Sequence, residues 1–190
     1  MKFEKGIKML LVSSYPPREC GLATFSNDIV NAVELVFGNT LPIEVCALEN
    51  NNHQFTYNDE VKYTLSASCL DDYRQVAEKI NERNDIGLVC IQHEFGLFGG
   101  EYGDYILSFI LALNKPIVAI WGNTVPKFGM GPFYPENHNL SKNIEVKGLS
   151  CRPCSKIGFD KCPKKHFKCI QNISVDDIKD AAKNLRLNIQ

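Results

Sequence analysis

The sequence predicts an α/β fold: a Rossmann-like parallel sheet with helices on both faces. Two observations predict it. Short apolar runs typical of buried strands alternate with stretches whose apolar residues recur at helical spacing. Residues 7–14 form a buried-strand run that ends at a Tyr-Pro-Pro turn signal. The run at residues 86–92 is nearly all apolar, as expected of a central parallel strand buried on both faces. Strand–helix–strand repetition of this kind indicates a parallel sheet covered by helices, which is a Rossmann-like domain.

The pattern gives each element an expected place. Strands 10–13, 89–92 and 117–120 should be neighbours in one sheet. Ser68 with Asp71, and Ser174 with Asp177, have the spacing of boxes that cap helices. We therefore expect a Rossmann-like domain over residues 1–121. A Gly/Pro-rich loop, a cysteine-rich segment and a final helix should follow over residues 122–190.

Composition narrows the class of protein. The 190 residues suit one domain with an appendage, and a formal net charge of −1 argues against nucleic acid as a partner. No secretory signal or membrane-spanning run is visible, so we expect a cytoplasmic protein. The basic stretch 161–168 is either a solvated turn or a contact with anionic lipid or sugar phosphate, which would place the protein at the inner face of the membrane.

Ligands of open parallel sheets bind beyond the carboxyl ends of the strands, and the loop after the first strand lies at such an end. Arg18 can pair with a phosphate there, and Gly21 can let the backbone approach a ligand closely. A tight strand-to-helix turn is the alternative explanation for Gly21.

Two further loops occupy equivalent positions. After the central strand, His93 and Glu94 can bind sugar hydroxyls or move a proton, although His93 can equally be a structural histidine. The sequence adds Gly99 and Gly100 to this acceptor-binding set. After the strand at 117–120, the next turn can bind the phosphate of a donor, or it can equally be a plain turn. Its candidate residues are Gly122, Thr124 and Lys127.

Four of the eight cysteines are clustered: Cys151, Cys154, Cys162 and Cys169. Their number suits a tetrahedral zinc site, with His166 between the last two. Packed free thiols and disulfides are the alternatives, and a reducing compartment favours metal over disulfides. The other cysteines, Cys20 among them, are expected to behave as small apolar residues.

The segments LLVSSYPPRECGLATFSNDIVNAV and CIQHEFGLFGGEYGDYILSFILALNKPIV resemble the amino-terminal, acceptor-side domain of the retaining group-one (family four) glycosyltransferases. This resemblance covers about residues 7–118. It implies half of a GT-B fold, with acceptor contacts near Gly21 and His93.

From KPIVAIWGNTVPKFGMGPFYP onward the chain is similar to the carboxyl-terminal end of the inverting heptosyltransferases of family nine, including LSCRPCSKIGFDKCPKKHFKCIQNIS. This resemblance covers about residues 115–190, so the chain looks like a chimera joined near residues 115–118. It lacks the Glu-x7-Glu motif of the first family. Where the second family has Asp-x-Gly-x-x-His, residues 103–108 read GDYILS, in which Asp104 is not followed by the motif's glycine and histidine.

Together the residues and the resemblances predict a glycosyltransferase-type protein. It would bind or transfer a sugar from a nucleotide sugar to a glycan or lipid-linked acceptor, for cell-envelope polysaccharide or lipopolysaccharide synthesis, with no cofactor required for catalysis. Because the donor motifs are missing, the enzyme is expected to be incomplete. The alternative is a non-catalytic domain that binds sugar or nucleotide.

Overall fold

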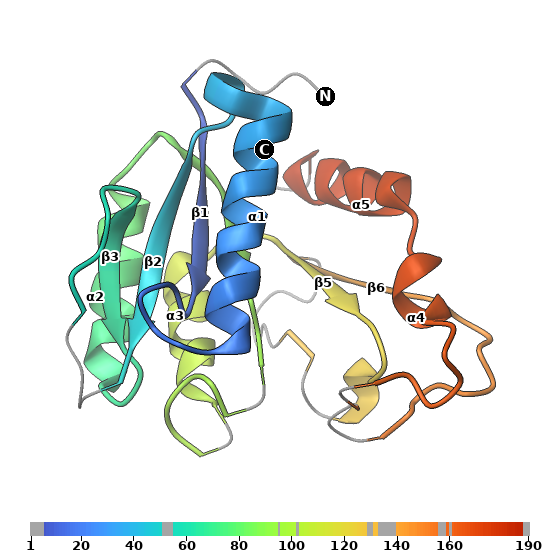
Figure 1. The fold of residues 1–190 in the computed structure, drawn as a ribbon. Helices are drawn as coiled ribbons and strands as arrows, with labels where there is room; N and C mark the ends of the chain where they lie inside the picture. Colours follow the sequence, from blue (N-terminus) through green and yellow to red (C-terminus); the bar gives the residue numbers. More distant parts are fainter. Residues whose placement is uncertain are drawn as a thin grey trace. The chain divides into compact units, whose positions relative to one another are not determined.

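Figure 1 shows the computed structural model of the chain. It describes residues 6–50, 55–94, 96–101, 103–128, 131–132, 140–155, 159 and 161–187. The chain divides into two compact units, Met1–Leu113 (unit 1) and Asn114–Gln190 (unit 2).

Unit 1 contains a four-stranded sheet whose hydrogen-bonded order is β3-β2-β1-β4, with every neighbouring pair parallel. This confirms the expected α/β class and the Rossmann-like half-domain. The elements of unit 1, in chain order, are β1 (Lys8–Ser13), α1 (Gly21–Phe37), the short 3-10 helix η1 (Gly38–Thr40), β2 (Ile43–Glu49), β3 (Val61–Ser66), α2 (Leu70–Asn81), β4 (Ile86–Ile91) and α3 (Tyr105–Leu113).

The two faces of this sheet are covered by different helices (Figure 1). Leu10 and Val12 of β1 pack into the cluster that contains residues of α2 and α3. Met9 and Leu11, which alternate with them, pack into the cluster that contains Val30 of α1. A strand whose successive side chains enter two different cores must be apolar throughout, which explains the uninterrupted run read from the sequence.

Two expectations about strand order and capping are wrong. Strand β4 is the last strand in the order of the four-stranded sheet and Leu88 is 46% exposed, so this strand is not the central strand buried on both faces that the sequence predicted. Strand β5 (Ile117–Trp121) pairs with β6 (Ser141–Glu145) in a second sheet instead of with β4. Helix α2 begins one residue after Cys69, which caps it without a side-chain hydrogen bond, so Ser68 is not the cap.

Unit 2 is built on the parallel pair β5 and β6, with α5 (Val175–Leu187) packed against both strands. Ala181 and Leu185 of α5 are buried. Ser174 does cap this helix as expected, because its Oγ accepts hydrogen bonds from the backbone N–H groups of Asp176 and Asp177. The remaining elements are the 3-10 helix η2 (Pro126–Phe128) and α4 (Lys168–Gln171).

An ion-pair network joins the strands of unit 1 at the end of the sheet where they begin. Glu44 of β2 is buried, and its carboxylate accepts hydrogen bonds from Arg83 at 2.5 Å and from Lys8 at 2.7 Å. Asp85, which directly precedes β4, pairs with Arg83 at 2.6 Å. Arg83 also donates to the hydroxyl of Tyr63 on β3 at 3.2 Å. One guanidinium group therefore contacts residues from three parts of the sheet.

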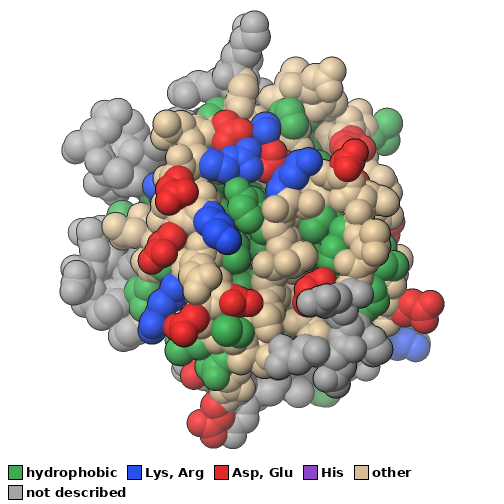
Figure 2. Space-filling model, turned by 90° about the vertical axis from the view of Figure 1, so that its left-hand side faces the viewer, with side chains coloured by type: hydrophobic (Ala, Val, Ile, Leu, Met, Phe, Trp, Pro, Cys, Tyr) green, Lys and Arg blue, Asp and Glu red, His purple; other side chains and the backbone are tan. Residues whose placement is uncertain are grey.

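Figure 2 shows the face of the protein over β3 and α2, where basic and acidic side chains are interspersed. Such a mixed surface produces no large field of a single sign on this face. None of the helices that the structure describes has the length and apolar character needed to cross a membrane.

The first prediction concerns the network. Replacing Arg83 with Ala should lower the free energy of unfolding by about 3 kcal/mol, because buried Glu44 would lose its closest partner. The matched control is Arg74→Ala, which removes an exposed pair with Asp71 and should cost less than about 0.5 kcal/mol. Equal effects in denaturant unfolding would show that the network does not hold the sheet.

The second prediction concerns pH. Hydrogen bonds from Arg83 and Lys8 outweigh burial and lower the pKa of Glu44 below its ordinary value of 4.5, and Arg83 lowers the pKa of Asp85 below 3.8. A carboxyl group with a lowered pKa in the folded state stabilises the protein above its unfolded pKa and loses that effect as the pH falls. The free energy of unfolding should therefore decline below about pH 4.5. Arg83→Ala should decline less steeply, and parallel curves for both proteins would contradict the assignment.

Candidate functional site

Two loops of unit 1 begin at the same end of the sheet, where β1 and β4 finish. Strands β1 and β4 are adjacent and parallel, so the segments that follow them, residues 14–20 and 92–104, begin at their shared carboxyl end. This is the edge at which ligands of open parallel sheets bind. The candidate acceptor residues of these loops lie in the two segments or in the first turn of α1, so the structure places them around the carboxyl end of the strands. They are Arg18, Gly21, His93 and Glu94.

The β1–α1 loop is anchored by buried hydroxyl groups and a thiol. Ser26 of α1 donates from Oγ to the Oγ of Ser13 at 2.7 Å, and both residues are fully buried. The Oγ of Ser14 and the Sγ of Cys20 lie 3.3 Å apart. The Sγ of Cys20 accepts a hydrogen bond from the backbone N–H of Ala23 at 3.4 Å, so Cys20 caps α1.

Cys20 is therefore not the small apolar residue that the sequence suggested. Burial raises the pKa of Cys20, but the hydrogen bonds from Ser14 and Ala23 and the charge of Arg18 outweigh burial and lower the pKa overall. Sequence reasoning missed this role because cysteine is not among the preferred capping residues. Its position directly before Gly21, at a strand-to-helix turn, was the available signal.

Gly21 and Arg18 remain open to a ligand in different ways. A Cβ atom built on Gly21 would meet no heavy atom within 4 Å. Because Gly21 has ordinary helical geometry as the first residue of α1, the protein's own packing does not require a glycine there. The Nη1 of Arg18 donates to the carbonyl of Leu48, at the end of β2, over 3.4 Å. This bond holds Arg18 along the same edge of the sheet.

His93 and Glu94 follow β4 and are both exposed. The imidazole of His93 stacks on the ring of buried Phe98, with 5.8 Å between the ring centroids. Desolvation by the packed surroundings lowers the pKa of His93 below 6.5, so near neutral pH the imidazole is uncharged. A neutral imidazole held against an aromatic ring can accept or donate one hydrogen bond to a sugar hydroxyl.

Gly99 and Gly100 have a packing explanation. The backbone N–H of Gly99 donates to the hydroxyl of Tyr73 at 3.1 Å, and a Cβ on Gly99 would overlap the carbonyl oxygen of Ala67. Gly100 has a φ of +85°, and a Cβ there would overlap the carboxylate of Asp104. The loop therefore needs both glycines in order to fold, and their contact with an acceptor stays a prediction.

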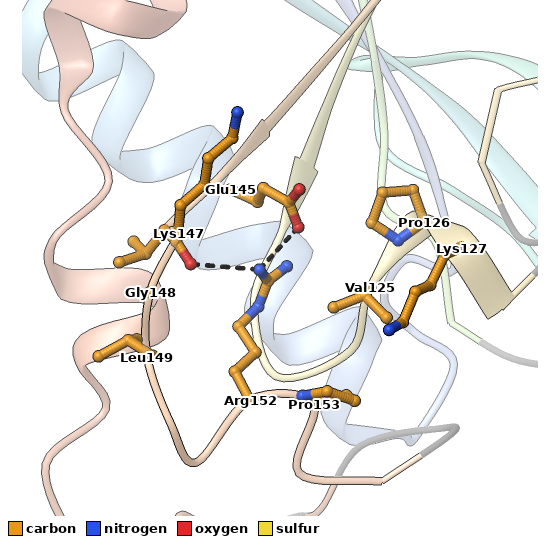
Figure 3. Close-up of a pocket in the computed structure, with 10 residues that line it drawn as sticks. Val125, Pro126, Lys127, Glu145, Lys147, Gly148, Leu149, Arg152 and Pro153 are labelled. Carbon is orange, nitrogen blue, oxygen red and sulfur yellow. Dashed lines mark hydrogen bonds and ion pairs between the residues drawn. The ribbon is translucent and has the colours of Figure 1, made fainter.

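Unit 2 has a pocket of about 290 Å³ beyond the carboxyl ends of β5 and β6 (Figure 3). The loop after β5 contributes Val125, Pro126 and Lys127, and the segment from Glu145 to Pro153 forms the rest of the lining. Figure 3 shows Lys127 and Lys147 on opposite sides of Arg152. The charged groups around the pocket are therefore three cations and the Glu145 carboxylate, which favours an anionic ligand.

Arg152 fixes the shape of this pocket. Its guanidinium group donates to Oε2 of Glu145 at 2.7 Å and to the carbonyl of Val146 at 3.2 Å (Figure 3). It also donates to the carbonyls of Gly122 and Thr124, at 2.6 and 2.7 Å. Two of the three candidate donor residues thus hold Arg152 through their backbones, whereas Lys127 is exposed at the pocket. The sequence analysis missed Arg152, because an arginine between two cysteines gives no signal of its own.

The four clustered cysteines lie in unit 2, and all eight cysteines of the chain are free. Desolvation and the neighbouring thiols of Cys151, Cys169 and Cys162 raise the pKa of Cys154. Within the described residues, which include these four cysteines and His166, no three metal-binding side chains converge closely enough to hold an ion. The structure therefore brings the thiols into one neighbourhood without assembling a ligand set, and it forms none of the disulfides that were the alternative.

Comparison of the chain with protein-family models, with curated proteins and with solved structures gave no match.

The third prediction separates a binding glycine from a folding glycine. Gly21→Ala should leave the free energy of unfolding unchanged or raise it by up to about 1 kcal/mol, because alanine is the better helix residue and the space is open. Gly99→Ala should lower it by about 1–3 kcal/mol through overlap with the Ala67 carbonyl. Denaturant unfolding measures both. If Gly21→Ala were strongly destabilised, the fold itself would require this glycine, and its role would be purely structural.

Proposed function

We propose that the chain is a glycosyltransferase-type protein that binds a nucleotide sugar and a glycan or lipid-linked acceptor of cell-envelope polysaccharide or lipopolysaccharide synthesis. The observation that carries the proposal is the placement of candidate ligand residues at carboxyl ends of parallel strands in both units. The sequence resemblances to the two glycosyltransferase families support the same class.

The acceptor belongs to unit 1 in this proposal. Arg18 offers a fixed guanidinium group, Glu94 an exposed carboxylate and His93 a neutral imidazole against Phe98. Sugar hydroxyl groups need both donors and acceptors at short range, and these three groups supply them. The open space at Gly21 lets a ligand approach the backbone at the start of α1 closely, beside the turn that Cys20 caps.

The donor phosphates belong to the pocket of unit 2. Arg152 is already bound to Glu145 and three carbonyls, so it shapes the pocket and leaves ligand binding to others. Lys127 and Lys147 are exposed lining residues that can bind a diphosphate as point charges. Transfer in this scheme uses no metal, and the clustered cysteines contribute to folding, with structural zinc as their proposed ligand.

The second candidate function is binding without catalysis. The absence of the donor motifs of both families favours it. Catalysis of transfer depends on holding two substrates in a reactive geometry, which contributes roughly 7–11 kcal/mol of barrier reduction. A chain that binds each substrate separately gains none of this. We place either activity on the cytoplasmic side, at the inner face of the membrane, where lipid-linked acceptors are found.

The fourth prediction tests donor binding. Lys127→Ala should weaken binding of a nucleoside diphosphate about tenfold, the effect of losing one charge-assisted hydrogen bond of about 1.5 kcal/mol. Calorimetry with UDP, GDP and ADP measures it. Lys183→Ala, on the exposed surface of α5, is the matched control and should bind like the original protein. If Lys127→Ala and the original protein bound nucleoside diphosphates with equal affinity, the proposal of a phosphate site in this pocket would be wrong.

Turnover separates the two candidate functions. Incubated alone with nucleotide sugars and lipid-linked acceptors, the chain should release nucleoside diphosphate far more slowly than about 1 s⁻¹, the low end of typical enzymes. Acceptor-dependent release near that rate, abolished by His93→Ala, would show a working enzyme and rule out the binding-only function. No turnover together with no nucleotide or acceptor binding would reject both.

A further inference from the structure

Unit 2 exposes apolar side chains within a run of lysines. The chain from residue 161 to residue 171 contains four lysines and no aspartate or glutamate. All four lysines are exposed, and among them Phe167 and Ile170 are 47% and 53% exposed. One exposed apolar side chain is ordinary, whereas several beside charges of one sign indicate an interaction surface. We call this group of residues the lysine–apolar surface: Phe159, Lys161, Lys164, Lys165, Phe167, Lys168 and Ile170.

The apolar residues of this surface are brought together at the loop after β5. The side chain of Ile170 lies against Gly122, where an added Cβ atom would overlap Cδ1 of Ile170. The Nδ2 of Asn123, the next residue, donates to the backbone carbonyl of Phe159 at 3.3 Å. Phe159 is itself 52% exposed. The backbone N–H of Ile170 donates to the carbonyl of Phe167 at 3.0 Å, so Phe167 is one turn away from Ile170.

The backbone around Phe167 is held in conformations that L-residues rarely adopt. Lys165 and Phe167 have φ angles of +56° and +48°, in the left-handed region that favours glycine. Two hydrogen bonds fix this turn. The backbone N–H of Lys165 donates to the carbonyl of Cys162 at 2.9 Å, and that of Lys168 donates to Nδ1 of His166 at 3.0 Å. The fold thus maintains a strained aromatic residue whose side chain stays about half in water, and such strain is typical of sites that meet a ligand.

The chemistry of the surface fits the headgroup region of a lipid bilayer. Lysines attract anionic headgroups, and apolar side chains beside them leave water when they enter the boundary between headgroups and acyl chains. A free phosphate would use the lysines alone and leave the apolar side chains in water. A nucleic acid could stack a base on Phe167, but the aliphatic side chain of Ile170 has no face for stacking. Lysines and apolar side chains together therefore favour a bilayer.

We propose that the lysine–apolar surface docks unit 2 on an anionic lipid bilayer, with its lysines at the headgroup phosphates and Phe167 and Ile170 inserted at the boundary with the acyl chains. The inference rests on the proposed function, because a lipid-linked acceptor is held in such a bilayer. The surface also lies beside the pocket of unit 2. The carbonyl of Gly122, the residue that Ile170 contacts, accepts a hydrogen bond from Arg152 at 2.6 Å. Docking therefore brings the pocket to the membrane surface.

The fifth prediction is binding of the full chain to vesicles, measured by flotation. Vesicles with about one third phosphatidylglycerol should be bound at least about tenfold more tightly than phosphatidylcholine vesicles, and salt at about 0.5 M should weaken this binding. The double variant Lys164→Gln, Lys165→Gln should bind about 25-fold more weakly, since each lysine near an anionic surface contributes about fivefold. The matched control is Lys62→Gln, Lys79→Gln, which changes two exposed lysines of unit 1 and should bind within about twofold of the original protein.

Insertion of the aromatic ring has its own measurement. Phe167→Ser keeps every lysine and should bind anionic vesicles about tenfold more weakly, because the apolar ring that leaves water is gone. Phe25→Ser removes a phenylalanine of α1 that is 54% exposed and should keep the full affinity. If both serine variants bind like the original protein while the lysine variant binds weakly, the surface holds anions without entering lipid and the proposal is wrong.

Vesicle binding and nucleotide binding are separate measurements, so the two proposals fail separately. The variant of Lys164 and Lys165 should bind nucleoside diphosphates like the original protein. A chain that binds anionic vesicles but neither nucleotide nor acceptor would keep the lysine–apolar surface and reject the proposed function. A chain that binds nucleotide but no anionic vesicles would do the reverse.

A fluorescence test covers the case in which the serine and glutamine variants fail to fold. Phe167→Trp places an indole at the expected depth, and the original protein, whose only tryptophan is Trp121, is the control. Anionic vesicles with brominated acyl chains should quench the fluorescence that the new indole adds. Vesicle binding without any quenching beyond that of the original protein would overturn insertion. Tighter binding to single-stranded RNA than to anionic vesicles at equal salt would overturn the proposal in favour of a nucleic acid.

Discussion

Strand β1 hydrogen-bonds to β2 on one side and to β4 on the other, always in parallel register, and unit 1 depends on this double pairing. Parallel pairing requires crossover connections, and α1, between β1 and β2, and α2, between β3 and β4, pack on opposite faces of the sheet. Parallel pairing also directs the carboxyl ends of the strands to one edge. The loop that carries Arg18 and the loop that carries His93 are neighbours for that reason, although 75 positions separate these residues in the sequence.

The two ends of the sheet differ in how their charged side chains are used. At the end where the strands begin, Arg83 and Lys8 form ion pairs with Glu44 and Asp85, so these charges are paired within the protein. At the opposite end, side chains such as Glu94 stay exposed, and the space at Gly21 is open. Stability therefore comes from one edge while the other is left available for ligands. The pocket of unit 2 shows the same division between structural and available charges. Arg152 is hydrogen-bonded within the protein, whereas Lys127 is exposed.

The sequence was sufficient for the features that local chemistry determines. The apolar run of β1 predicted a buried strand, and Ser174 predicted the start of α5, because each depends on a few neighbouring residues. Strand order was not predictable in this way. Strands β4 and β5 have similar apolar patterns, and nothing in such a pattern states which strand is the hydrogen-bonding partner. The roles of Cys20 and Arg152 were missed because their partners, Ser14 and Glu145, are set by the fold.

The arrangement around Arg152 has a consequence for the entropy of binding. Its side chain closes the loop after β5 onto the segment after β6 through four acceptors, and Cys151 and Cys154 flank Arg152 in the sequence. The conformational freedom of both loops is lost when unit 2 folds, before any ligand arrives. A ligand that enters the pocket then has few segments left to order, so more of its contact energy is expressed as affinity. Whatever loosens the segment around residues 151–154 restores that freedom and weakens the pocket from a distance.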